Sequence, residues 1–226
     1  MTNVFIISAP SGSGKSTLVK ELRGAVPNLE FSISYTTRTP RGVEQNGREY
    51  YFITPEQFEG MIAKDEFLEH ANVFGNYYGT ATRFLRAAEQ NGNDLLLDID
   101  VQGAEQIRSK IPQAVSIFIL PPNRSELEQR LRNRSQDAES VIQRRLDAAT
   151  REIENYGKYD YILVNDRLDD SVAGLEAIVL SERLKRKGQA NAEMSARAEM
   201  YRLENIRERL QPILQSFREV AASGGK

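Results

Sequence analysis

Short apolar runs, separated by longer stretches with helical periodicity, recur along the chain. Four of these runs are rich in Val, Ile or Leu and too short for helices, so they predict buried strands at residues 4–7, 95–97, 115–120 and 161–164. Strands that are apolar throughout, with helices between them, indicate a parallel sheet covered by helices on both faces. The predicted fold class is therefore α/β, with a three-layer parallel-sheet core.

Local signals mark the ends of several helices. Thr54, followed by Pro55 and by Gln57 three residues after the cap, predicts a helix that begins at residue 55. Asn123 with Glu126 predicts a second helix start, and Asn91-Gly92 predicts the end of a helix that begins near Thr82.

Two stretches interrupt this alternation. Residues 32–80 are rich in Ser, Thr, Tyr and Gly and predict a small β-rich insertion. Residues 124–151 contain seven arginines in a helical pattern. After about residue 184 the chain becomes polar and rich in Ala, Glu and Arg.

Composition excludes several classes of function. With 30 Lys and Arg against 32 Asp and Glu, the net charge of −2 argues against a dedicated nucleic-acid binder. The absence of Cys excludes disulfides, thiolate nucleophiles and Cys-based zinc sites, and it fits a reducing compartment. The single histidine, His70, argues against His-driven hydrolysis and is expected to be structural. We find no membrane-spanning run and no signal peptide, so we expect a cytoplasmic protein without a membrane partner.

The strongest motif is Ala-Pro-Ser-Gly-Ser-Gly-Lys-Ser at residues 9–16, between the first predicted strand and a helical pattern. This is the context of a phosphate-binding loop, in which backbone N–H groups and a helix N-terminus face phosphate oxygens. Lys15 can reach the β- and γ-phosphates, and the Ser16 hydroxyl can bind Mg²⁺. Ala9 replaces the usual first glycine. The alternative, a Gly/Ser turn before a helix, is disfavoured by the position directly after an apolar strand. The expected ATP-binding residues here are Ser11, Gly12, Ser13, Gly14, Lys15, Ser16 and Thr17.

An acidic strand end supports this interpretation. The run Leu-Leu-Leu-Asp-Ile-Asp at residues 95–100 places carboxylates at the C-terminal edge of the sheet, where ligands bind. The chain lacks the Asn-Lys-x-Asp motif that reads guanine in GTPases, and its size and arginine-rich segment disfavour an ATPase motor. A small-molecule kinase with a separate acceptor site remains.

Four further segments, at residues 32–52, 66–69, 76–80 and 98–103, resemble guanylate kinases. Together with the phosphate loop they keep the order and spacing of that family from residue 4 to about residue 183. The resemblance implies ATP and GMP as substrates, transfer of the γ-phosphoryl group to give ADP and GDP, use of dGMP, and a place in purine nucleotide metabolism. It also implies Mg²⁺ as the cofactor.

The resemblance also implies an acceptor site. In the family the positions of Arg38, Arg41, Tyr50 and Tyr78 hold the GMP phosphate; guanidinium groups can bind a phosphate bidentately, although the tyrosines could be ordinary strand aromatics. Glu69 would accept from guanine N1–H and N2–H₂. Ser34 and Thr80 would donate to O6, where adenine carries an amine, so the wrong base leaves polar groups unpaired. Asp98 would lie on the acceptor side and Asp100 nearer Mg²⁺.

The arginine-rich segment resembles the lid of the family. Arg130, Arg134 and Arg145 match its arginine positions and would neutralise charge on the transferred phosphoryl group. The alternative, a solvated helical face, fits Arg124, Arg132, Arg144 and Arg151 better. Asn165, after the last strand, is a candidate ATP contact, with a simple turn as the alternative. The expected catalytic residues are Lys15, Arg38, Arg130, Arg134 and Arg145.

These features predict the following division: core at 1–31, 86–122 and 152–184, GMP-binding insertion at 32–85, lid at 123–151 and helical C-terminal extension at 185–226. Two other functions are possible. A non-catalytic guanylate-kinase-like interaction module is disfavoured because Lys15, Ser16 and the lid arginines are present. A kinase for a phosphorylated sugar would not need Glu69, Ser34 and Thr80.

The extension lies beyond the resemblance. An apolar stripe with spacings of three and four residues runs along it, at Leu203, Ile206, Leu210, Ile213, Phe217 and Val220. Pro212 is expected to interrupt the helix. This interruption disfavours the alternative of a free-standing coiled coil. We expect docking onto the core or onto the tail of a partner, so the chain is a monomer or a homo-oligomer in which the tail mediates self-association.

Overall fold

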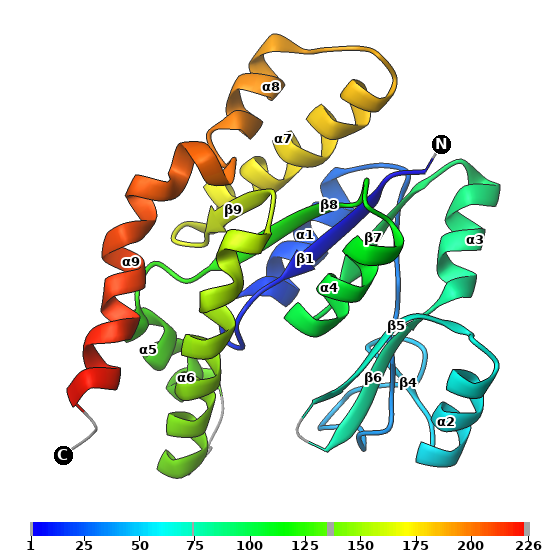
Figure 1. Ribbon diagram of the computed structural model, residues 1–226, viewed down its shortest axis with the longest axis horizontal. Helices are drawn as coiled ribbons and strands as arrows, with labels where there is room; N and C mark the ends of the chain where they lie inside the picture. Colours follow the sequence, from blue (N-terminus) through cyan, green and yellow to red (C-terminus); the bar gives the residue numbers. More distant parts are fainter. Residues whose placement is uncertain (1, 74, 135–137, 224–226) are drawn as a thin grey trace. The chain divides into compact units, whose positions relative to one another are not determined.

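The computed structural model describes residues 2–73, 75–134 and 138–223; for residue 134 and residues 219–223 it describes the backbone alone. Its main sheet has five strands in the order β2-β7-β1-β8-β9 (Figure 1). These are β1 (Val4–Ser8), β2 (Leu29–Phe31), β7 (Asp94–Asp98), β8 (Val115–Leu120) and β9 (Tyr161–Val164). Strand β2 pairs in parallel with β7, and β8 pairs in parallel with β9. The predicted α/β class and its four strands are confirmed.

Burial explains why these strands could be found in the sequence. Every residue of β1 is buried, and in β7 only the final residue, Asp98, is partly exposed. The β2 strand was not predicted, because its three residues are all half-buried and include Glu30. A short strand with a charged residue does not form the continuous apolar run that marks a fully buried strand.

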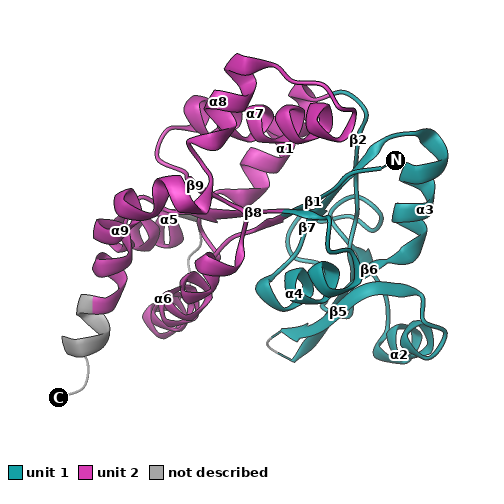
Figure 2. Cartoon of the chain, turned by 45° about the horizontal axis from the view of Figure 1, so that its top comes forward, with its two compact units in different colours: residues 1–6, 27–115 teal, residues 7–26, 116–226 magenta. Residues whose placement is uncertain are grey.

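The chain divides into two compact units, drawn in teal and magenta in Figure 2. Unit 1 comprises residues 1–6 and 27–115. It contains a second sheet in the order β4-β3-β6-β5, formed by β3 (Tyr35–Thr36), β4 (Tyr51–Phe52), β5 (Phe67–Val73) and β6 (Asn76–Ala81). Its helices are α2 (Pro55–Ala63), α3 (Thr82–Asn91) and α4 (Val101–Lys110).

The helix ends of unit 1 follow the sequence signals. Thr54 and Gln57 form the reciprocal capping box of α2, with Pro55 in the first turn. Gly92 ends α3 in the left-handed conformation, at φ +67°. These predicted boundaries are confirmed.

Stacked aromatic rings fix α2 on the small sheet. Phe58 of α2 is fully buried, and its ring lies 4.4 Å from that of Phe67 and 5.1 Å from that of Tyr77. A Cβ atom on Gly79 would come within 3.0 Å of Phe58 and 2.9 Å of Phe67. The rings can therefore close over β6 only because residue 79 has no side chain.

Unit 2 comprises residues 7–26 and 116–226. Its helices are α1 (Lys15–Ala25), α5 (Arg124–Arg134), α6 (Glu139–Ile153), the short 3₁₀ helix η1 (Glu154–Lys158), α7 (Leu168–Arg186), α8 (Ala192–Glu199) and α9 (Leu203–Ser223). Helix α1 packs on α7, and both α7 and α9 contact β9. Within the described ranges, no helix is long and apolar enough to cross a bilayer.

The C-terminal extension packs against its own unit. Helix α9 contacts α5, α6 and β9, and the views from two directions agree (Figures 1 and 2). Of the predicted stripe, Ile206, Leu210 and Phe217 are buried, while the side chain of Val220 lies outside the described part of the chain. The expectation that Pro212 interrupts the helix was wrong, because α9 continues through it. A proline in a helix removes one backbone hydrogen bond, and the buried face of α9 offsets that cost.

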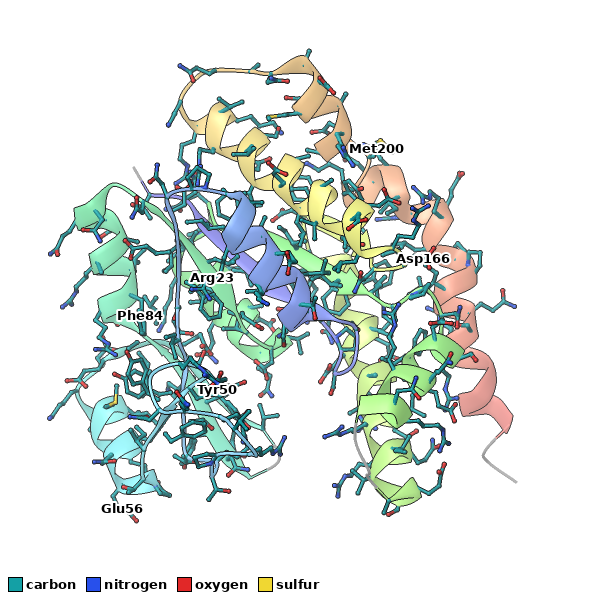
Figure 3. All side chains as sticks on the ribbon, turned by 180° about the vertical axis from the view of Figure 1, so that it is seen from behind. Arg23, Tyr50, Glu56, Phe84, Asp166 and Met200 are labelled. Atoms are coloured by element: carbon teal, nitrogen blue, oxygen red, sulfur yellow. The ribbon has the colours of Figure 1, made fainter. Side chains whose placement is uncertain are left out.

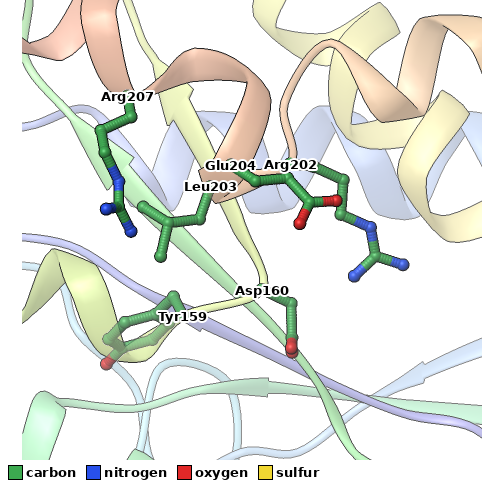
Figure 4. A pocket seen from close by; sticks show the side chains of 6 residues that line it. All are labelled: Tyr159, Asp160, Arg202, Leu203, Glu204 and Arg207. Atoms are coloured by element: carbon green, nitrogen blue, oxygen red, sulfur yellow. The ribbon is translucent and has the colours of Figure 1, made fainter.

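Paired charges surround the start of α9. Arg202 Nη2 donates to Glu182 Oε1 at 2.8 Å, and its guanidinium lies 4.1 Å from the centre of the Tyr161 ring. A cavity of about 270 Å³ lies beside it, lined by Tyr159, Asp160, Arg202, Leu203, Glu204 and Arg207 (Figure 4). Asp160 accepts from the Ser116 N–H and hydroxyl, and Arg202 is paired with Glu182. Two of the charged side chains that line this cavity therefore have hydrogen-bond partners within unit 2.

If α9 is part of the folded core of unit 2, Phe217→Ala will destabilise the protein. Removing a buried Phe side chain costs about 3–5 kcal/mol through lost transfer energy and the cavity that remains. Urea unfolding measures this loss. Met200→Ala, at a side chain in the same extension that is 55% exposed (Figure 3), serves as the control and should change stability by less than about 0.5 kcal/mol. Equal, small effects of both substitutions would contradict the docking.

Candidate functional site

The glycine-rich loop joins β1 to α1 and has the backbone geometry of an anion site. Gly12 and Gly14 have φ values of +93° and +87°, and Ser13 N–H donates to Pro10 O at 3.1 Å. Helix α1 begins at Lys15, and its first turn contains no acidic residue. Two glycines with positive φ, a helix N-terminus without acids and a lysine together favour phosphate binding.

Helix α5 packs directly against this loop. A Cβ atom on Gly12 would lie 2.9 Å from Leu127 Cδ1 and 2.9 Å from Leu131 Cδ2, so a side chain at residue 12 is excluded. Sequence reasoning did not identify these two leucines as part of the site. Their i, i+4 spacing on an otherwise charged helix could have indicated that they form a buried face.

Three of the predicted ATP-site residues are in contact. Asn165 Nδ2 donates to the main-chain oxygen of Ser13 at 2.8 Å. Arg130 Nη2 donates to the main-chain oxygen of Asn165 at 3.1 Å. The phosphate loop, the end of β9 and the first arginine of the predicted lid are therefore linked through Asn165.

The other predicted donor-side residues are distributed over unit 2. Lys15, Ser16 and Thr17 form the first turn of α1, with Ser16 and Thr17 exposed, and Ser11 is exposed in the loop. Arg145 is half-buried on α6, and the side chain of Arg134 lies outside the described part of the chain. Arg132 pairs with Glu128 at 2.7 Å and with Glu139 at 2.6 Å, in agreement with the predicted solvated, paired face.

In unit 1, Arg38 is held by a fork of hydrogen bonds. Its Nη1 donates to Glu44 Oε2 at 2.9 Å and its Nη2 to Glu44 Oε1 at 3.0 Å, while the residue is only 8% exposed. The guanidinium lies 5.3 Å from the centre of the Tyr50 ring, and that ring lies 5.9 Å from the ring of Tyr78 (Tyr50 is labelled in Figure 3). Three of the four predicted phosphate-binding side chains are thus grouped.

Glu44 organises the loop that carries these arginines. Besides Arg38, it accepts from the Arg41 N–H at 2.8 Å, and the Arg41 side chain itself is exposed. The hydrogen bonds from Arg38 are the main reason that the pKa of Glu44 lies below its usual range. Glu44 was not among the predicted site residues. The sequence offered one indication of this role, the position of an acidic residue three residues after Arg41.

Glu69 is a buried carboxyl on β5. It is 3% exposed and pairs across the sheet with Thr80, after a bulge between Phe67 and Glu69. Burial raises the pKa of Glu69 to about 7; repulsion from Asp100 adds to the rise, and the Thr80 hydroxyl opposes it. A Cβ atom on Gly103 would lie 2.5 Å from Glu69 Oε2, so α4 can approach the carboxyl only with glycine there.

The remaining predicted acceptor-side residues also belong to unit 1. Ser34 immediately precedes β3, and Asp98 ends β7. Asp100 caps α4, because its Oδ1 accepts from the Gly103 N–H at 2.8 Å. His70 is held by structural contacts: Gln106 bonds to both its N–H and its carbonyl oxygen, and its ring meets Phe58 and Phe67.

The chain matches known proteins over most of its length. The sequence model described as guanylate kinase matches residues 1–182. A guanylate kinase of Koribacter versatilis is 58% identical over 223 residues, covering 96% of each chain, and thus includes most of the extension. That of Escherichia coli is 48% identical over 184 residues, covering 80% of this chain and 89% of the relative. The crystal structure of a guanylate kinase from Anaplasma phagocytophilum has a TM-score of 0.65 at 31% identity, covering 84% and 88%.

The proton on Glu69 makes stability depend on pH. Because the folded-state pKa is raised from 4.5 to about 7, the folded protein binds this proton more tightly than the unfolded chain. The contribution of Glu69 to stability should therefore fall as pH rises from 4.5 to 7, by at most about 1.4 kcal/mol per pH unit, and then level off.

Urea unfolding of the wild type and of Glu69→Gln between pH 5 and pH 8 isolates this contribution as the difference between the two proteins. The neutral amide does not titrate, so the variant should gain stability relative to the wild type as pH rises. A difference that is constant over this range would show that the folded-state pKa of Glu69 is not raised.

Proposed function

The chain belongs to the guanylate kinase family, and we propose that it transfers the γ-phosphoryl group of ATP to GMP, giving ADP and GDP. The observation that carries this proposal is the buried Glu69 carboxyl in the same unit as the Arg38 fork. Together these groups match the two ends of a guanine nucleotide, the base edge and the phosphate. The glycine loop of unit 2 supplies the complementary site for a triphosphate.

We propose that GMP is recognised because the hydrogen-bond donors and acceptors of the acceptor site match those of guanine and of the phosphate. The Glu69 carboxylate accepts from guanine N1–H and N2–H₂, and the hydroxyls of Ser34 and Thr80 donate to O6. Arg38, Arg41, Tyr50 and Tyr78 bind the phosphate, and Asp98 lies on the acceptor side. None of these residues is assigned to the ribose, so we propose that dGMP is also a substrate.

Phosphoryl transfer itself requires charge stabilisation rather than a general base. The attacking phosphate oxygen of GMP is already anionic, so the protein has to position the two nucleotides and neutralise the charge that develops. The loop N–H groups and Lys15 act on the ATP phosphates. Arg38, Arg130, Arg134 and Arg145 act on the transferred group.

We propose Ser16 and Asp100 as the protein groups toward Mg²⁺. Hydroxyl and carboxylate oxygens suit this ion, which usually binds through few protein ligands together with substrate phosphates. In the described part of the chain no three acidic or histidine side chains are grouped to hold a metal, which fits an ion held largely by nucleotide. Bound there, Mg²⁺ would neutralise phosphate charge. With no cysteine to oxidise, we further propose a cytoplasmic enzyme that recycles GMP in purine metabolism.

The base selectivity tests this function. We expect GMP, but not AMP, CMP or UMP, to support ATP consumption in a coupled assay. Glu69→Gln should lower kcat/KM for GMP by about 30- to 1,000-fold, since its NH₂ group faces the N–H donors of guanine. The GMP:AMP ratio should fall accordingly, with thermal melting as the folding control. Turnover of another monophosphate in place of GMP would exclude this acceptor.

The Arg38–Glu44 fork gives a second prediction. Glu44→Gln should raise KM for GMP by roughly tenfold, because a buried guanidinium loses its charged partner and its fixed orientation. Glu49→Gln is the matched control, since Glu49 forms an exposed pair with Arg48 on the same loop. KM for ATP should be unchanged in both variants. Equal KM values for GMP in Glu44→Gln and Glu49→Gln would exclude a role of the fork in binding.

A further inference from the structure

Asn165 holds three separate hydrogen bonds at the end of β9. Its N–H donates to Leu120 O at 2.7 Å, which continues the pairing with β8. Its main-chain oxygen accepts from Arg130, and its Nδ2 donates to Ser13 O at 2.8 Å. The residue is 7% exposed, so its side chain is committed to the phosphate loop rather than to solvent.

The bond to Ser13 fixes one peptide plane of the loop. A trans peptide is planar, with its C=O and N–H pointing in opposite directions, and no cis bond occurs among the described residues. When Asn165 pins the Ser13 carbonyl, the N–H of Gly14 must point the other way. That N–H belongs to the left-handed glycine that caps α1, where an anion is favoured.

The packing around this peptide allows little freedom. Ser13 is 1% exposed, and its buried hydroxyl makes no hydrogen bond within the described residues. A Cβ atom on Gly14 would collide with Asn165 Nδ2. The Asn165 amide therefore fills the space beside Gly14 and is the side chain that orients the Ser13–Gly14 peptide.

We infer that Asn165 is a positioning residue of the phosphate loop: its side chain orients the Ser13–Gly14 peptide so that the Gly14 N–H faces the nucleotide phosphates. It acts through the loop and makes no selective contact with the adenine base. The inference rests on the proposed binding of ATP to this loop.

Two substitutions at Asn165 test this role. Asn165→Ala removes the amide but keeps the main-chain oxygen that accepts from Arg130. Asn165→Asp keeps the shape but sets a carboxylate against the Ser13 carbonyl. Asn205→Ala is the matched control, because Asn205 Nδ2 also donates to a main-chain oxygen of unit 2, that of Glu199 at 2.7 Å.

The measurement is KM and kcat with ATP and with ITP, in which an oxygen replaces the amine of adenine, together with KM for GMP. Without the amide the Gly14 N–H is no longer held toward the phosphates, so both Asn165 variants should raise KM for the triphosphate roughly 10- to 150-fold, the loss of one hydrogen bond to a charged group. The ATP:ITP ratio of kcat/KM should equal that of the wild type, because base and loop then contribute independently. KM for GMP should not change, and Asn205→Ala should match the wild type throughout.

Three results would overturn the inference. A collapse of the ATP:ITP ratio in the variants would make Asn165 a base contact. Wild-type KM values for both triphosphates in a folded variant would exclude any role in the loop. An equal rise of KM for GMP would indicate a general structural defect. If Asn165→Ala fails to fold, Asn165→Asp gives the same readouts. Failure of the wild type itself to use ATP with GMP would instead refute the proposed function.

Discussion

A buried charged side chain that binds a charged substrate needs an oppositely charged partner while the site is empty, because an unpaired buried charge destabilises the fold. Removing a guanidinium from water costs several kcal/mol unless a close, hydrogen-bonded anion compensates it. Arg38 meets this requirement with Glu44, through two parallel N–H···O bonds of 2.9 Å and 3.0 Å. The same carboxylate also accepts from the Arg41 N–H, so one acid holds the side chain of Arg38 and the backbone of Arg41.

Glu69 presents the opposite case, a buried acid whose pKa rises on burial. Its carboxyl is buried between β6 and the glycine of α4, and burial raises its pKa to about 7 although the charge of Lys110 opposes the rise. The nearby Asp100, whose Oδ1 caps α4, repels the Glu69 carboxylate and thereby further favours the proton. The proposed pairing with guanine N1–H and N2–H₂ requires the ionised carboxylate, so binding of the base would displace this proton.

The features that sequence could predict are those encoded within a few residues. The glycine loop, the capping box at Thr54 and the buried strands each depend on local patterns, and all of them lie where expected. The contacts of Leu127 and Leu131 with Gly12, and that of Asn165 with Ser13, join residues more than a hundred positions apart. No local pattern encodes such contacts. Glu44 illustrates a third case. It lies only six residues from Arg38 in the sequence, but its role as a charged partner depends on the burial of Arg38, which the loop sequence does not reveal.

The extension shows how tertiary packing overrides a local rule. Pro212 cannot donate a hydrogen bond within a helix, yet α9 continues through it because Leu210 and Leu214 on either side are buried. The same segment also pairs with the edge of the main sheet, because β9 is the last strand in the order. Ile162 N–H donates to Tyr201 O, and Tyr161 forms a bridge with Arg202, so the edge backbone of β9 is partly paired by the chain itself. An exposed strand edge invites pairing with another chain. Residues beyond the 182 that match the family model therefore cover part of the apolar surface and part of the open edge of unit 2.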